Sequence, residues 1–160
     1  MDWLTLTGLT GAVIAAATTG AVFPPGPWYD KLEKPAWTPP NWLFPLAWTA
    51  LYVAIIYAAY RITKTADPAP ALAFWACQIA FNALWTPIFF GLRKIGSALP
   101  VIAALWASVF ITLVLFWQRD IIAGMLFVPY IVWVSYAGAL NFDIWRRNRG
   151  RQMPSLQAEP

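Results

Sequence analysis

The chain has 160 residues, of which 60% are hydrophobic and 11% are charged. Soluble domains carry about 25% charged residues, so this composition excludes an ordinary soluble protein and indicates a membrane protein. The net charge is +4, but the basic residues lie near the ends of apolar segments, which argues against a nucleic-acid partner. The chain has no histidine and a single cysteine, Cys77. It therefore lacks the commonest metal ligand, an internal disulfide and a CxxC redox pair, and we expect no metal site.

Five stretches of the sequence contain no charged residue. Each has room for the roughly 20 residues with which a helix crosses a bilayer, and none shows the alternation of a membrane β-strand. The sequence therefore predicts an all-α membrane protein, a five-transmembrane-helix bundle that forms one domain. The expected segments are a domain at 1–151 with helices at about 4–23, 43–62, 70–91, 97–117 and 121–145, a structured loop at 24–42, and a flexible tail at 152–160.

The basic residues divide unequally between the two ends of such a bundle. Three of the 11 belong to the end that holds the N-terminus and the second and fourth loops, and eight belong to the other end. The positive-inside rule then places the N-terminus outside and the first loop and C-terminus in the cytoplasm. No basic residue precedes the first apolar stretch, so we expect a retained helix rather than a signal peptide.

The first expected helix carries small residues at every fourth position, namely Gly8, Ala12, Ala16 and Gly20. Such a ridge lets another helix backbone approach closely. We therefore interpret it as a packing surface.

The loop at 24–42 is rich in proline and contains four aromatic residues, Trp28, Tyr29, Trp37 and Trp42. Proline fixes φ and removes a hydrogen-bond donor, so we expect a stiff, non-helical segment. Two interpretations of its aromatic residues remain open. They form either a belt at the level of the lipid headgroups or a structured lid over the cytoplasmic end of the bundle.

The third expected helix has a polar and aromatic face formed by Gln78, Asn82, Trp85 and Phe89, which share one side of a helix. Lipid cannot hydrogen-bond a carboxamide, so this face should point into the protein or towards a ligand. The amides are either contacts between helices or, together with the rings, the wall of a cavity. Pro87 is expected to kink the helix.

A second face of the same helix carries the small residues Ala76, Ala80 and Ala83. A partner helix packed on this face would not cover Gln78 and Asn82, so the small residues predict a homodimer formed through the third helix. The ridge on the first helix is the competing surface.

The second and fifth expected helices carry candidate ligand-binding residues, and the fourth does not. In the second, Trp48 and Tyr52 lie one turn apart, whereas the fourth is aliphatic and is interpreted as scaffold. In the fifth, Trp133, Ala137 and Leu140 share a face on which small side chains leave room for a flat molecule.

Four motifs in order resemble one known family. The residues that carry the resemblance are Trp28, Tyr29, Leu32, Lys34, Pro35, Trp37, Pro39 and Pro40, then Trp48, Leu51 and Tyr52, then Gln78, Asn82, Trp85, Pro87, Phe89, Phe90 and Gly91, and finally Pro129, Tyr130, Trp133, Ala137, Leu140, Asn141, Trp145 and Arg146. The family is that of the tryptophan-rich sensory protein and translocator protein (TspO/MBR), known in animals as the peripheral benzodiazepine receptor. The resemblance covers nearly the whole chain and implies a bacterial membrane location.

The resemblance implies a five-helix bundle, often dimeric, with a pocket under the first loop. The implied ligands are tetrapyrroles such as protoporphyrin IX or a haem-like molecule, sterols, and benzodiazepine-type compounds. The implied ligand-binding residues are Tyr29, Trp48, Tyr52, Asn82, Trp85, Phe89, Trp133, Ala137 and Leu140. The family's C-terminal cholesterol motif is incomplete, because Phe142 stands where the motif has tyrosine, so a sterol receives little weight.

Three functions remain open. The first is binding and sensing of a tetrapyrrole. The second is light-dependent degradation of protoporphyrin, with Trp48 and Trp133 as redox-active catalytic indoles. The third is transport of a porphyrin or sterol, against which the sequence shows no acidic residue mid-membrane and no internal repeat.

We expect a porphyrin to be a ligand rather than a cofactor. The methionines lie outside the implied pocket and histidine is absent, so the usual axial iron ligands are missing. Metal-free porphyrin, or haem held without strong axial ligation, fits best. Lys31, Lys34 and Arg93 are candidates to meet its carboxylates.

Overall fold

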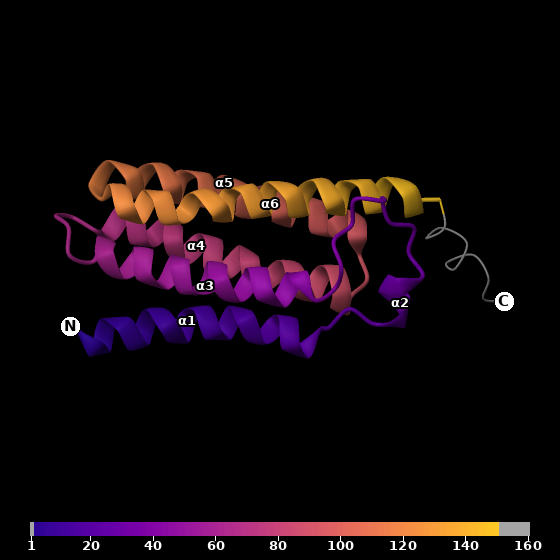
Figure 1. Ribbon diagram of the computed structural model, residues 1–160, viewed down its shortest axis with the longest axis horizontal. Helices are drawn as coiled ribbons and strands as arrows, with labels where there is room; N and C mark the ends of the chain where they lie inside the picture. The colour runs from indigo at the N-terminus through magenta and orange to yellow at the C-terminus, as the bar shows by residue number, and fades with distance from the viewer. Residues whose placement is uncertain (1, 151–160) are drawn as a thin grey trace.

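The computed structural model describes residues 2–150, and all its long elements are helices that run side by side along one axis (Figure 1). The long helices are α1 (Trp3–Val22), α3 (Leu43–Ile62), α4 (Ala69–Thr86), α5 (Ile95–Arg119) and α6 (Ile121–Asn148). A short helix α2 (Pro27–Asp30) lies in the first loop, and a π-helical turn η1 (Pro87–Gly91) extends α4. Five spans, one of them α4 with η1, are long and apolar enough to cross a membrane. The predicted fold class is confirmed. The expected tail at 152–160 lies outside the described residues.

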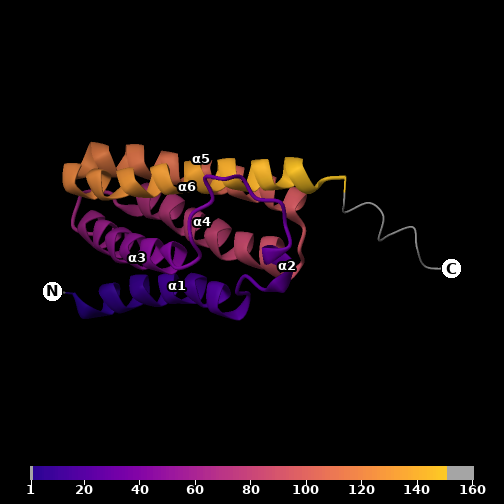
Figure 2. The same cartoon turned by 45° about the vertical axis from the view of Figure 1, so that its right-hand side comes forward.

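The helices form a ring in the order α1, α3, α6, α5, α4, and α4 returns to α1. The α5–α6 pair has the most extensive contact and lies on the side of the bundle farthest from α1 (Figure 2). The N-terminal end of α1 lies at one end of the bundle, whereas α2, the first loop and the C-terminal end of α6 lie at the other (Figure 1). The first loop is therefore placed to cover one end of the ring.

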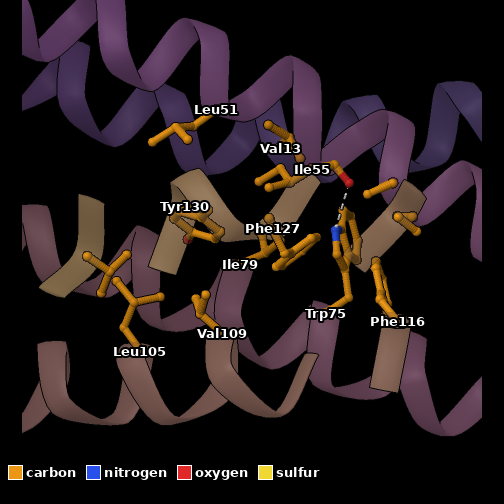
Figure 3. Close-up of a cluster of buried hydrophobic side chains, with 14 of the residues drawn as sticks. Val13, Leu51, Ile55, Trp75, Ile79, Leu105, Val109, Phe116, Phe127 and Tyr130 are labelled. Carbon is orange, nitrogen blue, oxygen red and sulfur yellow. Dashed lines mark hydrogen bonds between the residues drawn. The ribbon is translucent and has the colours of Figure 1, made fainter. Parts of the chain in front are cut away.

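A layer of large apolar side chains fills the centre of the ring (Figure 3). Ile55, Phe127 and Tyr130 are completely buried there, from α3 and α6. Trp75 of α4 lies beside them, and its indole Nε1 donates a hydrogen bond to the Ile55 carbonyl at 3.2 Å. Lipid is as apolar as this core, so close van der Waals packing and such interhelical bonds hold the helices together.

The turn between α5 and α6 consists of Asp120 alone. Its carboxylate caps α6 by accepting from the Ala123 N–H at 2.9 Å, and it pairs with the Arg61 guanidinium of α3 at 2.8 Å. The hydrogen bonds from Arg61, with that from Ala123, lower the pKa of Asp120 below its usual value. Close by, a Cβ on Gly124 would lie 2.7 Å from the Trp117 Cα, so only glycine lets the two helices approach this closely. One corner therefore joins three helices.

One expectation about local structure is wrong, and two gain detail. The proline-rich loop was expected to be non-helical, but residues 27–30 form α2, because proline is well tolerated at a first helical position. Pro87 is followed by a π-helical turn, in which the Leu92 N–H reaches the Pro87 carbonyl at 2.8 Å. The ridge of α1 is only half used inside the bundle. Ala16 is buried, whereas a Cβ on Gly8 or Gly20 would meet nothing within 4 Å.

Candidate ligand-binding site

The first loop begins its path over the bundle at Tyr29, whose side chain is 3% exposed. The Tyr29 ring packs edge-on against Phe89 and Phe90 of η1, with centroids 6.2 and 5.4 Å away. Lys34 fixes this turn, because its ammonium donates to the Tyr29 carbonyl at 2.6 Å and lies 4.7 Å from the Tyr29 ring centroid. Burial raises the pKa of Tyr29 to about 12.

Two residues of α6 hold the rest of the loop. Asn148 is buried and forms a clasp with the backbone of Glu33: its Oδ1 accepts from the Glu33 N–H at 3.1 Å, and its Nδ2 donates to the Glu33 carbonyl at 3.0 Å. The Tyr136 hydroxyl donates to the Trp37 carbonyl at 2.7 Å. These bonds favour the lid interpretation of the loop. Trp37 and Trp42 are exposed, as residues of a headgroup belt would be.

Beneath this lid, aromatic rings from α3 and α6 face one another. The Trp48 ring lies 5.3 Å from Tyr52 and 6.5 Å from Trp133, the latter at an interplanar angle of 87°. The Trp133 ring also contacts Phe44 at 5.8 Å and Tyr136 at 5.9 Å. The Trp133 Nε1 is buried, yet among the described residues it has no hydrogen-bond acceptor. This indole N–H is therefore available to a bound molecule or a water.

The two predicted amides join a chain of hydrogen bonds across three helices. The Tyr52 hydroxyl donates to Asn82 Oδ1 at 3.1 Å, and Asn82 Nδ2 donates to the Tyr130 hydroxyl at 3.1 Å. Tyr130 in turn donates to Gln78 Oε1 at 2.7 Å. Gln78 is completely buried, and its Nε2 has no partner among the described residues. The amides thus connect helices, as one of the two interpretations required. The other interpretation, a cavity wall formed by the amides and the rings, stays a prediction.

A second polar link lies at the lid end of α4. The Trp85 indole donates to Asn141 Oδ1 at 3.0 Å, and Asn141 Nδ2 donates to the Ile95 carbonyl at 3.0 Å. The Trp85 ring stacks on Phe89 with centroids 5.0 Å apart. Leu140 is buried in the same cluster as Tyr29 and Phe89. These contacts fix the orientation of Trp85 between the lid and the aromatic rings of α3 and α6.

A model of the TspO/MBR family matches residues 4–146 of this sequence. The chain belongs to the TspO/MBR family. It is 52% identical over 149 residues to Protein CrtK of Rhodobacter capsulatus, which covers 91% of this chain and 93% of that protein. It is 48% identical over 151 residues to a tryptophan-rich sensory protein of Cereibacter sphaeroides, covering 94% and 96%. It is also 33% identical over 156 residues to the human translocator protein, covering 92% of each. The family resemblance read from the sequence is confirmed.

In this TspO/MBR protein the predicted binding residues fall into two adjoining clusters. Trp48, Tyr52 and Trp133 pack around one cluster, with Asn82 hydrogen-bonded to it and Ala137 at its edge. Tyr29, Phe89 and Leu140 form the other, and Trp85 packs against both. The nine residues are thus brought to one region between α3, α4, α6 and the lid.

Several side chains of this region were not predicted as binding residues from the sequence. They are Phe44, Phe90, Tyr130, Tyr136 and Asn148. Tyr130 and Tyr136 each lie three positions from Trp133 on α6, so helical spacing was a signal that could have found them. Nothing in the sequence indicated that Asn148 clasps the loop, because its partner is a backbone segment 115 positions away.

Proposed function

We propose that this TspO/MBR membrane protein binds a tetrapyrrole of the protoporphyrin IX type between α3 and α6, beneath the first loop. The observation that supports the proposal most directly is the group of rings around Trp133, whose buried indole N–H lacks an acceptor. Aromatic faces suit a planar π-system, and an N–H at the edge suits a ligand that carries an acceptor. Sterols and benzodiazepine-type compounds are the competing ligands, and the same titration can rank them.

The charges near the lid refine how the carboxylates of such a ligand are met. The Lys34 ammonium already donates to backbone carbonyls of the loop, including Tyr29 at 2.6 Å and Asp30 at 3.1 Å. Arg93 is exposed, and its guanidinium lies 6.0 Å from the Trp28 ring. Arg93 is therefore a better candidate partner than Lys34 for a carboxylate at the rim of the lid.

The proposal is tested by titrating protoporphyrin IX in the dark against purified wild type and variants. Trp133→Ala removes a ring wall, and we expect weaker binding by about 5- to 150-fold, the equivalent of about 1–3 kcal/mol. Trp133→Phe keeps a ring and loses the N–H, so it should weaken binding less. Trp106→Ala is the matched control, because that indole bonds to Ser135 on the outer face of the α5–α6 pair. Equal effects of Trp106→Ala and Trp133→Ala would contradict the proposal.

The contact between the Trp48 and Trp133 indoles favours one second function, the light-dependent degradation of protoporphyrin. Indoles are readily oxidised and phenylalanine is not. Illuminating an aerobic sample therefore separates the two functions. In the enzyme hypothesis, Trp133→Phe retains most dark binding and loses conversion. A wild-type protein that binds porphyrin and forms no new chromophore under light would exclude the second function.

We further propose that the protein forms a homodimer through α4. Ala76, Cys77 and Ala80 are all exposed on that helix, on the side that leaves the amides inside the bundle. The natural Cys77 then lies at the interface, so oxidation in membranes should give a disulfide-linked dimer. Ala80→Leu should reduce both the cross-link and the dimer. A dimer that persists in Ala80→Leu and is lost in Ala12→Leu would assign the interface to α1.

The unequal division of basic residues supports an orientation with Asp2 outside and the lid in the cytoplasm. Gly150→Cys on a Cys77→Ser background places one thiol at an exposed position just beyond α6. An impermeant maleimide should label it only after the membrane is opened. Labelling from outside intact spheroplasts would reverse the orientation.

A further inference from the structure

A shallow cavity of about 610 Å³, open to the surroundings, lies at the end of the bundle opposite the lid, where α3, α5 and α6 meet. Residues 117–122, which form the end of α5, the turn and the start of α6, line the cavity together with Arg61. No residue of the tetrapyrrole site is among them. The cavity therefore needs an explanation of its own.

The charges of this cavity leave one guanidinium largely uncommitted. Arg61 and Asp120 neutralise each other through hydrogen bonds of 2.8 to 3.1 Å. Arg119 donates through Nη1 to the Leu115 carbonyl at 3.2 Å. A guanidinium has five N–H groups, and the other four of Arg119 have no partner among the described residues. The lining as a whole carries one net positive charge, which favours an anion.

The flanks of the same cavity are apolar and exposed. Trp117, Ile121 and Ile122 are 45%, 62% and 49% exposed, and all three line it. α3 and α5 end here and α6 begins, so the cavity lies at the level where lipid headgroups meet hydrocarbon. A cationic group beside exposed apolar side chains at that depth suits an amphiphile rather than a free anion.

We propose that this corner is a binding site for an anionic phospholipid. The Arg119 guanidinium meets the headgroup phosphate, and the acyl chains lie along Trp117, Ile121 and Ile122. The Arg61–Asp120 pair forms the back wall and holds α3 to the turn, so that the position of Arg119 is fixed. The site is independent of the tetrapyrrole proposal, because it shares no residue with it.

The test is native mass spectrometry of the full-length protein. The protein is mixed in detergent with equal amounts of phosphatidylglycerol and phosphatidylcholine that carry the same acyl chains, and the detergent is removed in the spectrometer. We expect wild type to retain phosphatidylglycerol preferentially. Arg119→Gln should lower that preference about fivefold, the value of one basic residue near a headgroup. Arg119→Lys keeps the charge and should retain most of the preference. Lys64→Gln is the matched control, because it removes one exposed charge at the same end without lining the cavity.

Three outcomes would overturn the proposal. The first is a wild type without preference for phosphatidylglycerol. The second is an equal loss of the phosphatidylglycerol preference in Lys64→Gln and Arg119→Gln, which would indicate that the positive charge of this end of the bundle, rather than a site at Arg119, attracts the lipid. The third is displacement of the lipid by an equal concentration of glycerol 3-phosphate, which would make the site one for a free phosphate. The thermal unfolding midpoint of Arg119→Gln should equal that of Lys64→Gln, which shows that Arg119→Gln is folded.

Discussion

The hydroxyl of Tyr130 makes two hydrogen bonds in a place that water cannot reach. It donates to Gln78 at 2.7 Å and accepts from Asn82 at 3.1 Å, and the side chain is completely buried. Tyr130→Phe removes both bonds and keeps the ring. Hydrogen bonds between membrane helices average about 0.6 kcal/mol, so two of them give about 1.2 kcal/mol. Gln78 would also be left with both polar atoms unpaired, and a buried unsatisfied group costs about 1–3 kcal/mol. We expect a total loss of about 2–4 kcal/mol.

The assay is reversible unfolding in mixed micelles with increasing SDS, followed by circular dichroism. Tyr52→Phe is the matched control, because it removes one bond of the same chain from a half-buried hydroxyl. It also leaves the Asn82 oxygen unpaired, so it should cost about 1 kcal/mol, less than Tyr130→Phe. In a double-mutant cycle, Gln78→Leu should recover part of the Tyr130→Phe loss, since the leucine leaves no amide unpaired. The reasoning is refuted if Tyr130→Phe costs no more than Tyr52→Phe, or if the cycle is additive.

Three further predictions concern the backbone, the lid and acid stability. Gly124→Ala should destabilise the protein by about 1–3 kcal/mol, because the new Cβ would lie 2.7 Å from a backbone atom. The Cβ of Gly138→Ala would have no atom within 4 Å, so this variant should be neutral or stabilising. Unfolding in SDS compares the two. Asn148→Ala should increase amide hydrogen exchange in the first loop with little change in the exchange of α5, and an unchanged loop would refute the clasp. Asp120 has a folded pKa below its unfolded value, so its contribution to the free energy of unfolding is complete above about pH 4 and is lost as the pH falls through the folded pKa. As the pH is lowered from 6 to 3, the thermal unfolding midpoint should therefore fall less steeply in Asp120→Asn than in wild type. An identical slope would refute the role of the Arg61 pair.

Much of the fold follows from hydrophobicity and charge. Charged residues bound each apolar stretch, so the number of helices and the position of the proline-rich loop follow from the sequence. The order of the helices around the ring does not. It depends on contacts such as that of the Trp75 indole with the Ile55 carbonyl, which no spacing within one helix can indicate. The π-helical turn that begins at Pro87 was also not predicted. A proline removes a hydrogen-bond donor, but this does not determine whether the helix kinks, ends or widens to a π-helical turn.

The candidate site was predictable where its residues share a helix face. Asn82 and Trp85 lie on one stripe, and Trp133 and Leu140 lie on another, and both stripes face inward. The sequence could not distinguish an amide that joins helices from one that borders a cavity; Asn82 joins helices, and its role beside a ligand stays a prediction. The hydrogen bonds that decide this come from Tyr52 and Tyr130 on two other helices. The loop contacts were beyond local reasoning for the same reason.

The clasp at Asn148 has a kinetic consequence for the proposed binding site, because α6 carries both Asn148, which holds the first loop, and Trp133, a proposed wall of that site. A molecule that passes beneath the first loop must open the clasp on its way in and again on its way out. The clasp then slows association and dissociation by the same factor and leaves the dissociation constant unchanged. In this proposal Asn148 changes residence time without changing affinity, whereas Trp133 changes both.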